Sequence, residues 1–189
     1  MFFVFFIAYS CYEHFPLKQD ITRTQNKFLT QDSILVEFPK IIQGKVTLVT
    51  MIYTNCPDIC PMTTHNMQMV FDSLKDDIKD QVRLVVITFD PERDLPYVLK
   101  DYAVIRNYDL SKWYFLTSDQ IQTNEVMLKF GIKAVKTDSS YDANGRLSYY
   151  ITHTDRISLI DKDGFIRKNY KGSVINVEEI VKDISYLLN

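Results

Sequence analysis

The sequence predicts a single α/β domain of three layers, in which helices cover both faces of a central mixed sheet. Residues 46–53 and 82–89 are continuously apolar and rich in β-branched residues, which is typical of strands buried on both faces. Each of these runs is followed by a helical pattern of apolar residues. The chain of 189 residues is long enough to form one such domain with a substantial core.

Short runs bounded by turn residues complete the order of elements. Apolar or alternating runs predict strands at residues 34–38, 46–53, 82–89, 113–117, 147–151, 156–160 and 165–170. Apolar residues at helical spacing predict helices at residues 62–79, 95–108, 119–130 and 176–188. The polar residues from Lys136 to Gly145 indicate a mobile loop. Alternating strands and helices that end in a β-hairpin and a helix have the order of a thioredoxin-like domain.

Local signals fix several of these boundaries. We expect Ser118 to cap the third helix and Gly131 to end it. Asp163-Gly164 is a strong hairpin turn between the last two strands. Asn176, followed three residues later by Glu179, is typical of the start of a helix.

Charge and cysteine content limit the possible functions. The 22 basic and 24 acidic residues leave a net charge of −2, and they form no basic cluster. We therefore expect no nucleic-acid partner. Cys56 and Cys60 lie four residues apart and form one unit, which leaves Cys11 as an odd third cysteine.

The N-terminal segment predicts export. Residues 1–9 are apolar and uncharged, and the run is shorter than the roughly 20 residues that span a bilayer. Its length matches the apolar core of a signal peptide. We therefore expect an export segment at residues 1–11, a polar tether at 12–27 and the folded domain at 28–189. This arrangement predicts a monomer held at the periplasmic face of a bacterial membrane.

Cys11 gives this segment two interpretations. The residues Ala8-Tyr9-Ser10 before it resemble the lipobox of bacterial lipoproteins, in which the cysteine is acylated. The usual Leu three residues before the cysteine is Ala8 here. The alternative is a plain signal peptide or a truncated anchor in which Cys11 has no role.

The chemistry of the chain is concentrated between Tyr53 and Pro61, where a buried strand becomes a helix. Such a junction carries unpaired backbone N–H groups at the positive end of the helix dipole. Both features favour the thiolate forms of Cys56 and Cys60, which bind metals or attack disulfides. A proline follows each cysteine and makes a rigid surface turn, which is a poor place for inert core thiols.

Metal binding and a reversible disulfide both fit this pair. Cysteines at helical i, i+4 spacing have Cβ atoms about 5–6 Å apart, whereas a disulfide needs about 3.5–4.5 Å. A metal between the sulfurs therefore requires less adjustment, although Pro61 indicates that the segment is not regular helix throughout. His153 lies between two predicted strands and adds an imidazole. Two thiolates and one imidazole suit Cu(I) or Zn(II), and three-coordination favours copper.

Other polar and sulfur-containing residues have plainer interpretations. His14 is interpreted as solvated, and His65 as a bystander on the first helix. Met67 and Met69 could form a soft copper ligand set, but a Met-rich helix face more often packs in the core. Asp90, at the end of the second buried strand, could place a carboxylate near His153 or cap its own turn.

Three segments resemble the Sco/SenC copper-chaperone family, and the resemblance covers residues 28–188. Residues 45–61, which end in Thr-Asn-Cys-Pro-Asp-Ile-Cys-Pro, resemble its core motif. Residues 88–94 are similar to its S-x-D-P-E-R-D segment. Residues 151–154 and 159–164 are similar to its V-D-H-S … L-I-D-P-x-G segment. Thr152 stands where the family often has Asp, an acidic neighbour that would orient the imidazole.

The resemblance implies a membrane-tethered, thioredoxin-like metallochaperone that binds copper through Cys56, Cys60 and His153. It further implies delivery of copper to, or reduction of, the dinuclear copper site of cytochrome c oxidase subunit II, or a similar copper or thiol protein. The alternative is a tethered thiol–disulfide reductase in which Cys56 attacks, Cys60 resolves and His153 matters little. A third interpretation, a periplasmic adaptor with a degenerate site, fits poorly with the intact Cys, Cys, His set.

Overall fold

The computed structural model describes residues 15–23, 25–141 and 147–188. Ten strands are assigned in this part of the chain: β1 (Gln19–Asp20), β2 (Asn26–Thr30), β3 (Leu35–Phe38), β4 (Val46–Ile52), β5 (Val82–Thr88), β6 (Trp113–Thr117), β7 (Ala134–Tyr141), β8 (Leu147–His153), β9 (Ile157–Ile160) and β10 (Phe165–Tyr170). The helices are η1 (Lys40–Ile42), α1 (Ile59–Asp72), α2 (Asp76–Lys79), α3 (Pro96–Ile105), α4 (Gln120–Phe130) and α5 (Val177–Leu188).

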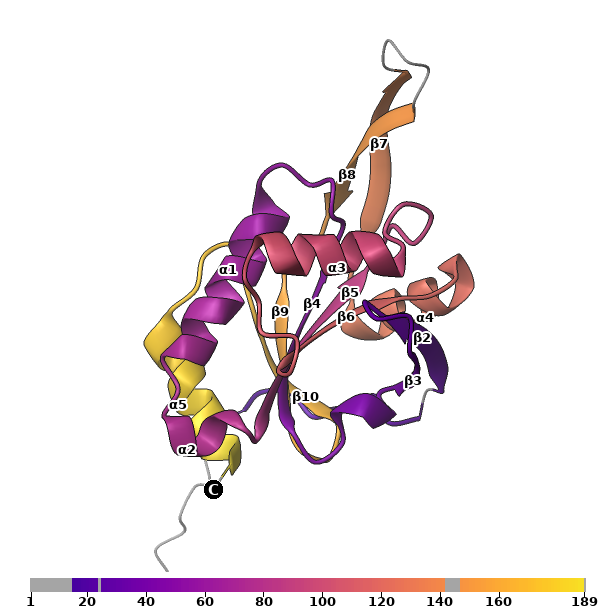
Figure 1. The fold of residues 1–189 in the computed structure, drawn as a ribbon. Helices are drawn as coiled ribbons and strands as arrows, with labels where there is room; N and C mark the ends of the chain where they lie inside the picture. The colour runs from indigo at the N-terminus through magenta and orange to yellow at the C-terminus, as the bar shows by residue number, and fades with distance from the viewer. Residues whose placement is uncertain (1–14, 24, 142–146, 189) are drawn as a thin grey trace, which may run out of the picture.

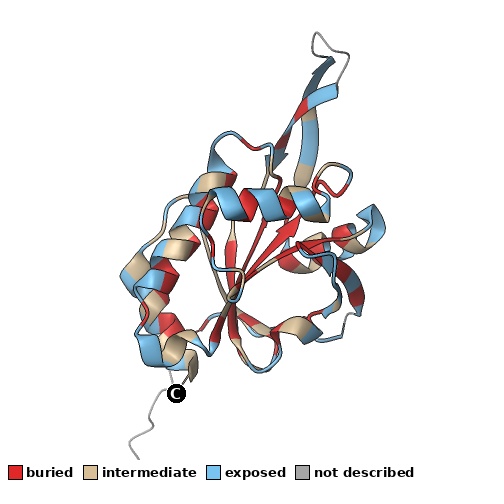
Figure 2. Ribbon diagram, viewed as in Figure 1, coloured by how far each residue is buried: buried red, intermediate tan, exposed pale blue. Residues whose placement is uncertain are grey.

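Eight strands form one mixed sheet in the order β1-β10-β9-β4-β5-β6-β2-β3 (Figure 1). β4 lies at its centre, parallel to β5 and antiparallel to β9. Every residue of β4 is buried, which explains the continuous apolar run in the sequence (Figure 2). The predicted central mixed sheet is confirmed.

Helices cover both faces of this sheet. Trp113 of β6 donates from its indole nitrogen to Gln68 of α1 at 2.9 Å, so this face of β6 points toward α1. The hydroxyls of Thr64 in α1 and Tyr102 in α3 lie 3.1 Å apart, which places α3 beside α1. Side chains on the other face of the sheet reach α4, where Phe130 packs against Phe38 at a ring distance of 6.0 Å.

Most of the predicted tether belongs to the folded domain. β1 pairs with β10, and Phe15 and Ile21 are 3 % and 0 % exposed. The prediction of a tether is therefore wrong for the described residues between 15 and 27. Isolated apolar residues in a polar stretch give no periodic signal, so the sequence pattern does not show that they pack on the sheet. The predictions for residues 1–11, Cys11 and His14 lie outside the described residues.

The predicted mobile loop is largely a strand. β7 pairs with β8 in a two-stranded hairpin that projects from the domain (Figure 1). Most residues of β7 are exposed, so its polar composition looks like that of a loop. Residues 142–145 of the predicted loop lie outside the described residues.

Several predicted boundaries shift by a few residues. α1 begins at Ile59 rather than Met62 and ends at Asp72, and the short α2 follows as a separate helix. Asp119, not Ser118, caps α4 by accepting a hydrogen bond from the backbone of Gln122. Other local signals hold. Gly131 ends α4 with a φ of 61°, and the Asn176 side chain accepts from the Glu179 backbone at 3.2 Å.

Candidate metal centre

The turn that carries both cysteines connects β4 to α1. Cys56 lies in the turn and Cys60 in the first turn of α1, and they are 9 % and 1 % exposed. The backbone N–H of Cys60 points to the Cys56 sulfur at 3.4 Å. This helix-start N–H group and the adjacent dipole stabilise negative charge on that sulfur. Cys56 and Cys60 are both free thiols rather than a disulfide in this structure.

Asp94 anchors this turn to the neighbouring strand. Its carboxylate accepts hydrogen bonds from the backbone and the hydroxyl of Thr54, two residues before Cys56, and from the Thr88 hydroxyl at the end of β5. Asp94 is 1 % exposed, and burial raises the pKa of its carboxyl group. The sequence motif contains Asp94 but gives it no role, because its partners lie 6 and 40 residues away.

His153 is the last residue of β8 and faces the cysteine turn. Its ring packs against Phe89 at 4.9 Å and edge-on to Tyr53 at 6.1 Å. Its Nδ1 lies 3.1 Å from the Thr154 carbonyl oxygen, which can only accept, so Nδ1 carries the proton. The unprotonated Nε2 then points to the Cys60 sulfur at 3.4 Å. This tautomer presents a ligand nitrogen to the cysteines.

The segment after His153 is fixed on both sides. Thr154 exchanges hydrogen bonds with Lys133, the residue before β7, at 2.9 and 3.0 Å. Asp155 accepts from the Thr63 hydroxyl of α1 at 3.1 Å and from the Ser173 backbone at 2.9 Å. These contacts hold the base of the hairpin against the helix that carries Cys60.

Cys56, Cys60 and His153 together form the candidate metal centre. Their ligand atoms all lie within 4.8 Å of one another. Sulfur and nitrogen atoms bonded to one ion at about 2.3 and 2.0 Å would be roughly 3.5–4 Å apart. The three atoms are therefore close enough to bind one ion with small side-chain adjustments. Two sulfurs and an imidazole nitrogen are donors for a soft or borderline ion such as Cu(I) or Zn(II).

The two thiols differ in charge. The S–H of Cys60 donates a hydrogen bond to Cys56, which is the main reason that the pKa of Cys56 falls to about 3 despite partial burial. The same bond and burial raise the pKa of Cys60 well above its ordinary value. Burial lowers the pKa of His153, but the hydrogen bonds to Cys56 and the Thr154 backbone and the charges of Cys56 and Asp155 together outweigh this effect, and the net change is upward. At neutral pH the centre thus holds one thiolate and one thiol.

Neither Asp90 nor Thr152 orients the imidazole of His153. The Asp90 carboxylate accepts from the Tyr149 hydroxyl at 2.7 and 2.9 Å, so it ties the end of β5 to β8. The partner that orients the imidazole of His153 is the Thr154 carbonyl. Thr152, at the position of the family's Asp, is exposed.

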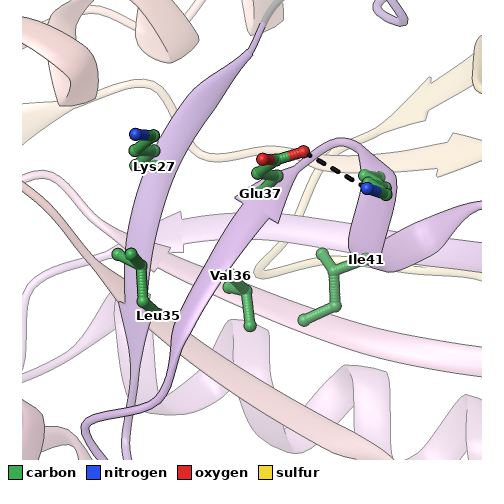
Figure 3. A pocket seen from close by; sticks show the side chains of 6 residues that line it. Lys27, Leu35, Val36, Glu37 and Ile41 are labelled. Atoms are coloured by element: carbon green, nitrogen blue, oxygen red, sulfur yellow. Dashed lines mark ion pairs between the residues drawn. The ribbon is translucent and has the colours of Figure 1, made fainter.

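The other candidate residues and a surface pocket lie outside the metal centre. Met67 is fully buried and packs in the core, as predicted, whereas His65 is exposed on α1. A separate surface pocket of about 450 Å³ lies at the edge strand β3 and shares no residue with the centre (Figure 3). Its residues are Lys27, Leu35, Val36, Glu37, Lys40 and Ile41. No helix in the described residues is both long and apolar enough to span a membrane.

A family model described as SCO1/SenC matches residues 19–189. The chain belongs to the SCO1/SenC family. The resemblance in the three sequence motifs is thereby confirmed. The match begins at Gln19, the first residue of β1, so it includes the strand that the sequence pattern assigned to the tether.

Two curated members of the SCO1/SenC family are similar over much of the chain. The SCO1 protein homolog of Bacillus subtilis (strain 168) is 34 % identical over 162 residues, which cover 83 % of this chain and 78 % of the relative. The SCO2-like protein of Rickettsia prowazekii (strain Madrid E) is 33 % identical over 129 residues, or 68 % of this chain. The chain spans 60 % of the length of this Rickettsia relative.

Solved SCO1/SenC structures confirm the thioredoxin-like fold. The copper-bound ScoI of Bradyrhizobium japonicum has a TM-score of 0.73 at 27 % identity, covering 87 % of this chain and 98 % of its own. The structure of BsSco, described as a member of the Sco family of cytochrome c oxidase assembly proteins with a disulfide switch, has a TM-score of 0.67 at 27 % identity. It covers 91 % of this chain and 95 % of its own.

We expect Cys56 to react with iodoacetamide almost independently of pH between about pH 5 and about pH 8. Its lowered folded-state pKa keeps it a thiolate over this whole range, whereas the reactivity of an ordinary thiol would rise on the order of 1000-fold. The rate is measured on reduced, metal-free protein by mass spectrometry of the labelled peptide. Cys56 in the urea-unfolded chain is the control and should show the steep rise, because unfolding removes the contacts that lower its pKa. A steep rise at Cys56 itself would contradict the assignment of charge.

Proposed function

We propose that this chain is a copper metallochaperone that holds Cu(I) at Cys56, Cys60 and His153. The observation that carries the proposal is the approach of His153 Nε2 to within 3.4 Å of the Cys60 sulfur, across 93 residues of sequence. It is supported by the copper-bound ScoI structure, whose fold this chain shares. The proposed acceptor is the dinuclear copper site of cytochrome c oxidase subunit II, in line with the description of BsSco as an oxidase assembly protein.

Copper is the cargo in this mechanism, and the three side chains have distinct tasks. The Cys56 thiolate is charged at neutral pH and makes the first contact with an incoming Cu(I). Cys60 still carries its proton and must lose it before its sulfur can bind, so uptake releases a proton to solvent. His153 closes the site with Nε2 while Nδ1 stays bonded to the Thr154 carbonyl. Release proceeds by exchange of these ligands, one at a time, for thiolates of the acceptor.

We expect His153→Ala to weaken Cu(I) binding by at least about 100-fold. Even residues that only orient a metal ligand contribute about 10–100-fold to affinity, and His153 would be a ligand itself. Affinity is measured anaerobically by competition with a chromophoric Cu(I) chelator. Thr152→Ala is the matched control, because this neighbour is exposed and should leave affinity unchanged. Full copper affinity in the His153 variant would exclude the ligand assignment.

Thiol–disulfide reduction is the second candidate, favoured by the pairing of a thiolate with a protonated thiol. The Cys56 thiolate would attack a target disulfide and form a mixed disulfide, releasing one target thiolate. Cys60, once deprotonated, would attack Cys56 and release the second target thiolate. The target gains two electrons and the chain becomes a Cys56–Cys60 disulfide, which an external dithiol must reduce again. The disulfide switch described for BsSco supports this chemistry.

The His153→Ala variant separates the two activities, because copper binding requires the imidazole and disulfide reduction does not. If reduction is the function, metal-free His153→Ala should keep its turnover of a disulfide substrate within about twofold of wild type, because the imidazole takes no part in sulfur exchange. Without added reductant, Cys60→Ser should instead stop at the mixed disulfide, which mass spectrometry detects. The assay uses a fluorogenic disulfide peptide with dithiothreitol as reductant. Absence of turnover by the wild-type chain would exclude the reductase.

We also propose that residues 1–11 export the chain and that acylation of Cys11 holds it at the periplasmic face of the membrane as a monomer. The support is the apolar run followed by small residues and a cysteine. Cys11→Ser should move the protein from the membrane fraction to the soluble fraction, as judged by fractionation of expressing cells. Cys56→Ser, which leaves the lipobox-like residues intact, should remain with the membrane. A Cys11 variant that also remains there would contradict acylation.

A further inference from the structure

The solvent-facing side of α1 carries two thioethers and an imidazole. Met62 and Met69 are each 44 % exposed, and His65 between them is exposed as well. We refer to these three residues as the Met–His face. The sequence pattern predicts a core position for Met69 together with Met67, and the structure contradicts this prediction for Met69. Met is usually a buried residue, so two exposed Met side chains beside an exposed His form an unusual surface.

Spacing places the members of the Met–His face side by side. Positions 62, 65 and 69 are three and four residues apart, so successive members are neighbours on one helix face, with Cβ atoms about 5–6 Å apart. Met67, in contrast, points into the core and is fully buried. His65 can therefore share a ligand with either flanking sulfur.

The surroundings leave the imidazole of His65 available to a ligand. Among the described residues, the structure gives the His65 side chain no hydrogen bond and no ion pair. From Ile59 to Phe71 the helix has no Asp, Glu, Lys or Arg, and Asp72 is its first carboxylate. The three members of the face are thus soft and borderline donors, whereas hard cations require oxygen ligands. The neighbouring carboxylate, Asp72, accepts a hydrogen bond from the Gln68 side chain at 2.7 Å.

We propose that the Met–His face is a second, weaker binding site for Cu(I). Thioether sulfur selects Cu(I), and imidazole completes the donor set, whereas Zn(II) sites are usually built from thiolate, imidazole and carboxylate ligands. The site would hold the ion between His65 and one or both Met sulfurs. This inference rests on the proposed function only for the identity of the cargo, since its ligands are separate from the metal centre.

The position of the face indicates what it does. Met62 lies two residues after Cys60, and His65 is about 7.5 Å along the helix axis from Cys60 at 1.5 Å per residue. Neutral thioethers bind Cu(I) less tightly than a thiolate does, because they lack its charge. Copper captured on the exposed face would therefore pass energetically downhill to Cys56, Cys60 and His153. The face would collect copper and the metal centre would retain it.

The test begins with a Cys56→Ser/Cys60→Ser/His153→Ala chain, in which the metal centre is removed. We expect this background to bind one Cu(I) per chain, measured anaerobically with Cu(I) supplied from a chromophoric chelator. Adding Met62→Leu and Met69→Leu should abolish this binding, because Leu keeps the size and helix propensity but lacks sulfur. Met67→Leu is the matched control and should retain the ion. Ag(I) should displace the bound Cu(I), and Zn(II) should not.

The same substitutions in the otherwise wild-type chain give a second measurement, should the background fail to fold. Wild type should bind two Cu(I), and Met62→Leu/Met69→Leu should bind one, with the tighter affinity unchanged. In His153→Ala only the more tightly bound Cu(I) should be lost, because this substitution affects the metal centre alone. Failure of the proposed function can therefore be distinguished from failure of the second site. The inference is overturned if wild type binds a single Cu(I), or if the Met62/Met69 variant retains the second ion.

Discussion

The register between β4 and β9 is the constraint on which the candidate metal centre depends. Ile157, the first residue of β9, pairs with Thr50 of β4 in the antiparallel direction. Continuing that register by three residues brings position 154 beside Tyr53, just past the end of β4. His153 therefore lies level with the start of the cysteine turn, although 93 residues separate it from Cys60. A shift of one residue would turn the strand over and point its side chains to the other face.

Polar contacts convert this approximate placement into a defined geometry. Asp94 joins the cysteine turn to β5, and Asp155 joins the segment after His153 to α1. Each of these two carboxylates accepts hydrogen bonds from several donors, so each can connect more than one helix, strand or turn. Asp94 is buried and close enough to add to the electrostatic cost of a charge on Cys60. The contact that holds the turn therefore also helps to keep Cys60 protonated until an ion or a disulfide arrives.

The sequence predicts the features that depend on neighbouring residues, but it does not predict contacts between residues far apart in the chain. The cysteine turn, the buried strands and the Asp163-Gly164 hairpin depend on neighbouring residues, and the structure has them where the sequence predicts them. His153 was found as a candidate because imidazoles are rare in this chain, but nothing local indicates which strand it faces. The roles of Asp94 and the Thr154 carbonyl depend on contacts made only after the sheet has formed. The same limit applies to β1 and β7, whose pairing partners decide their structure.

Helix α1 separates two kinds of sulfur by burial. Its first turn places Cys60 in the core beside the imidazole of His153, where a charged sulfur is costly without a cation. The Met–His face exposes neutral sulfurs, which need no counter-charge in water. A cation such as Cu(I) therefore gains most at the buried centre, because there it compensates the charge of the Cys56 thiolate and allows Cys60 to lose its proton. The difference in burial along one helix is sufficient to give the two sites different affinities and the transfer between them a direction.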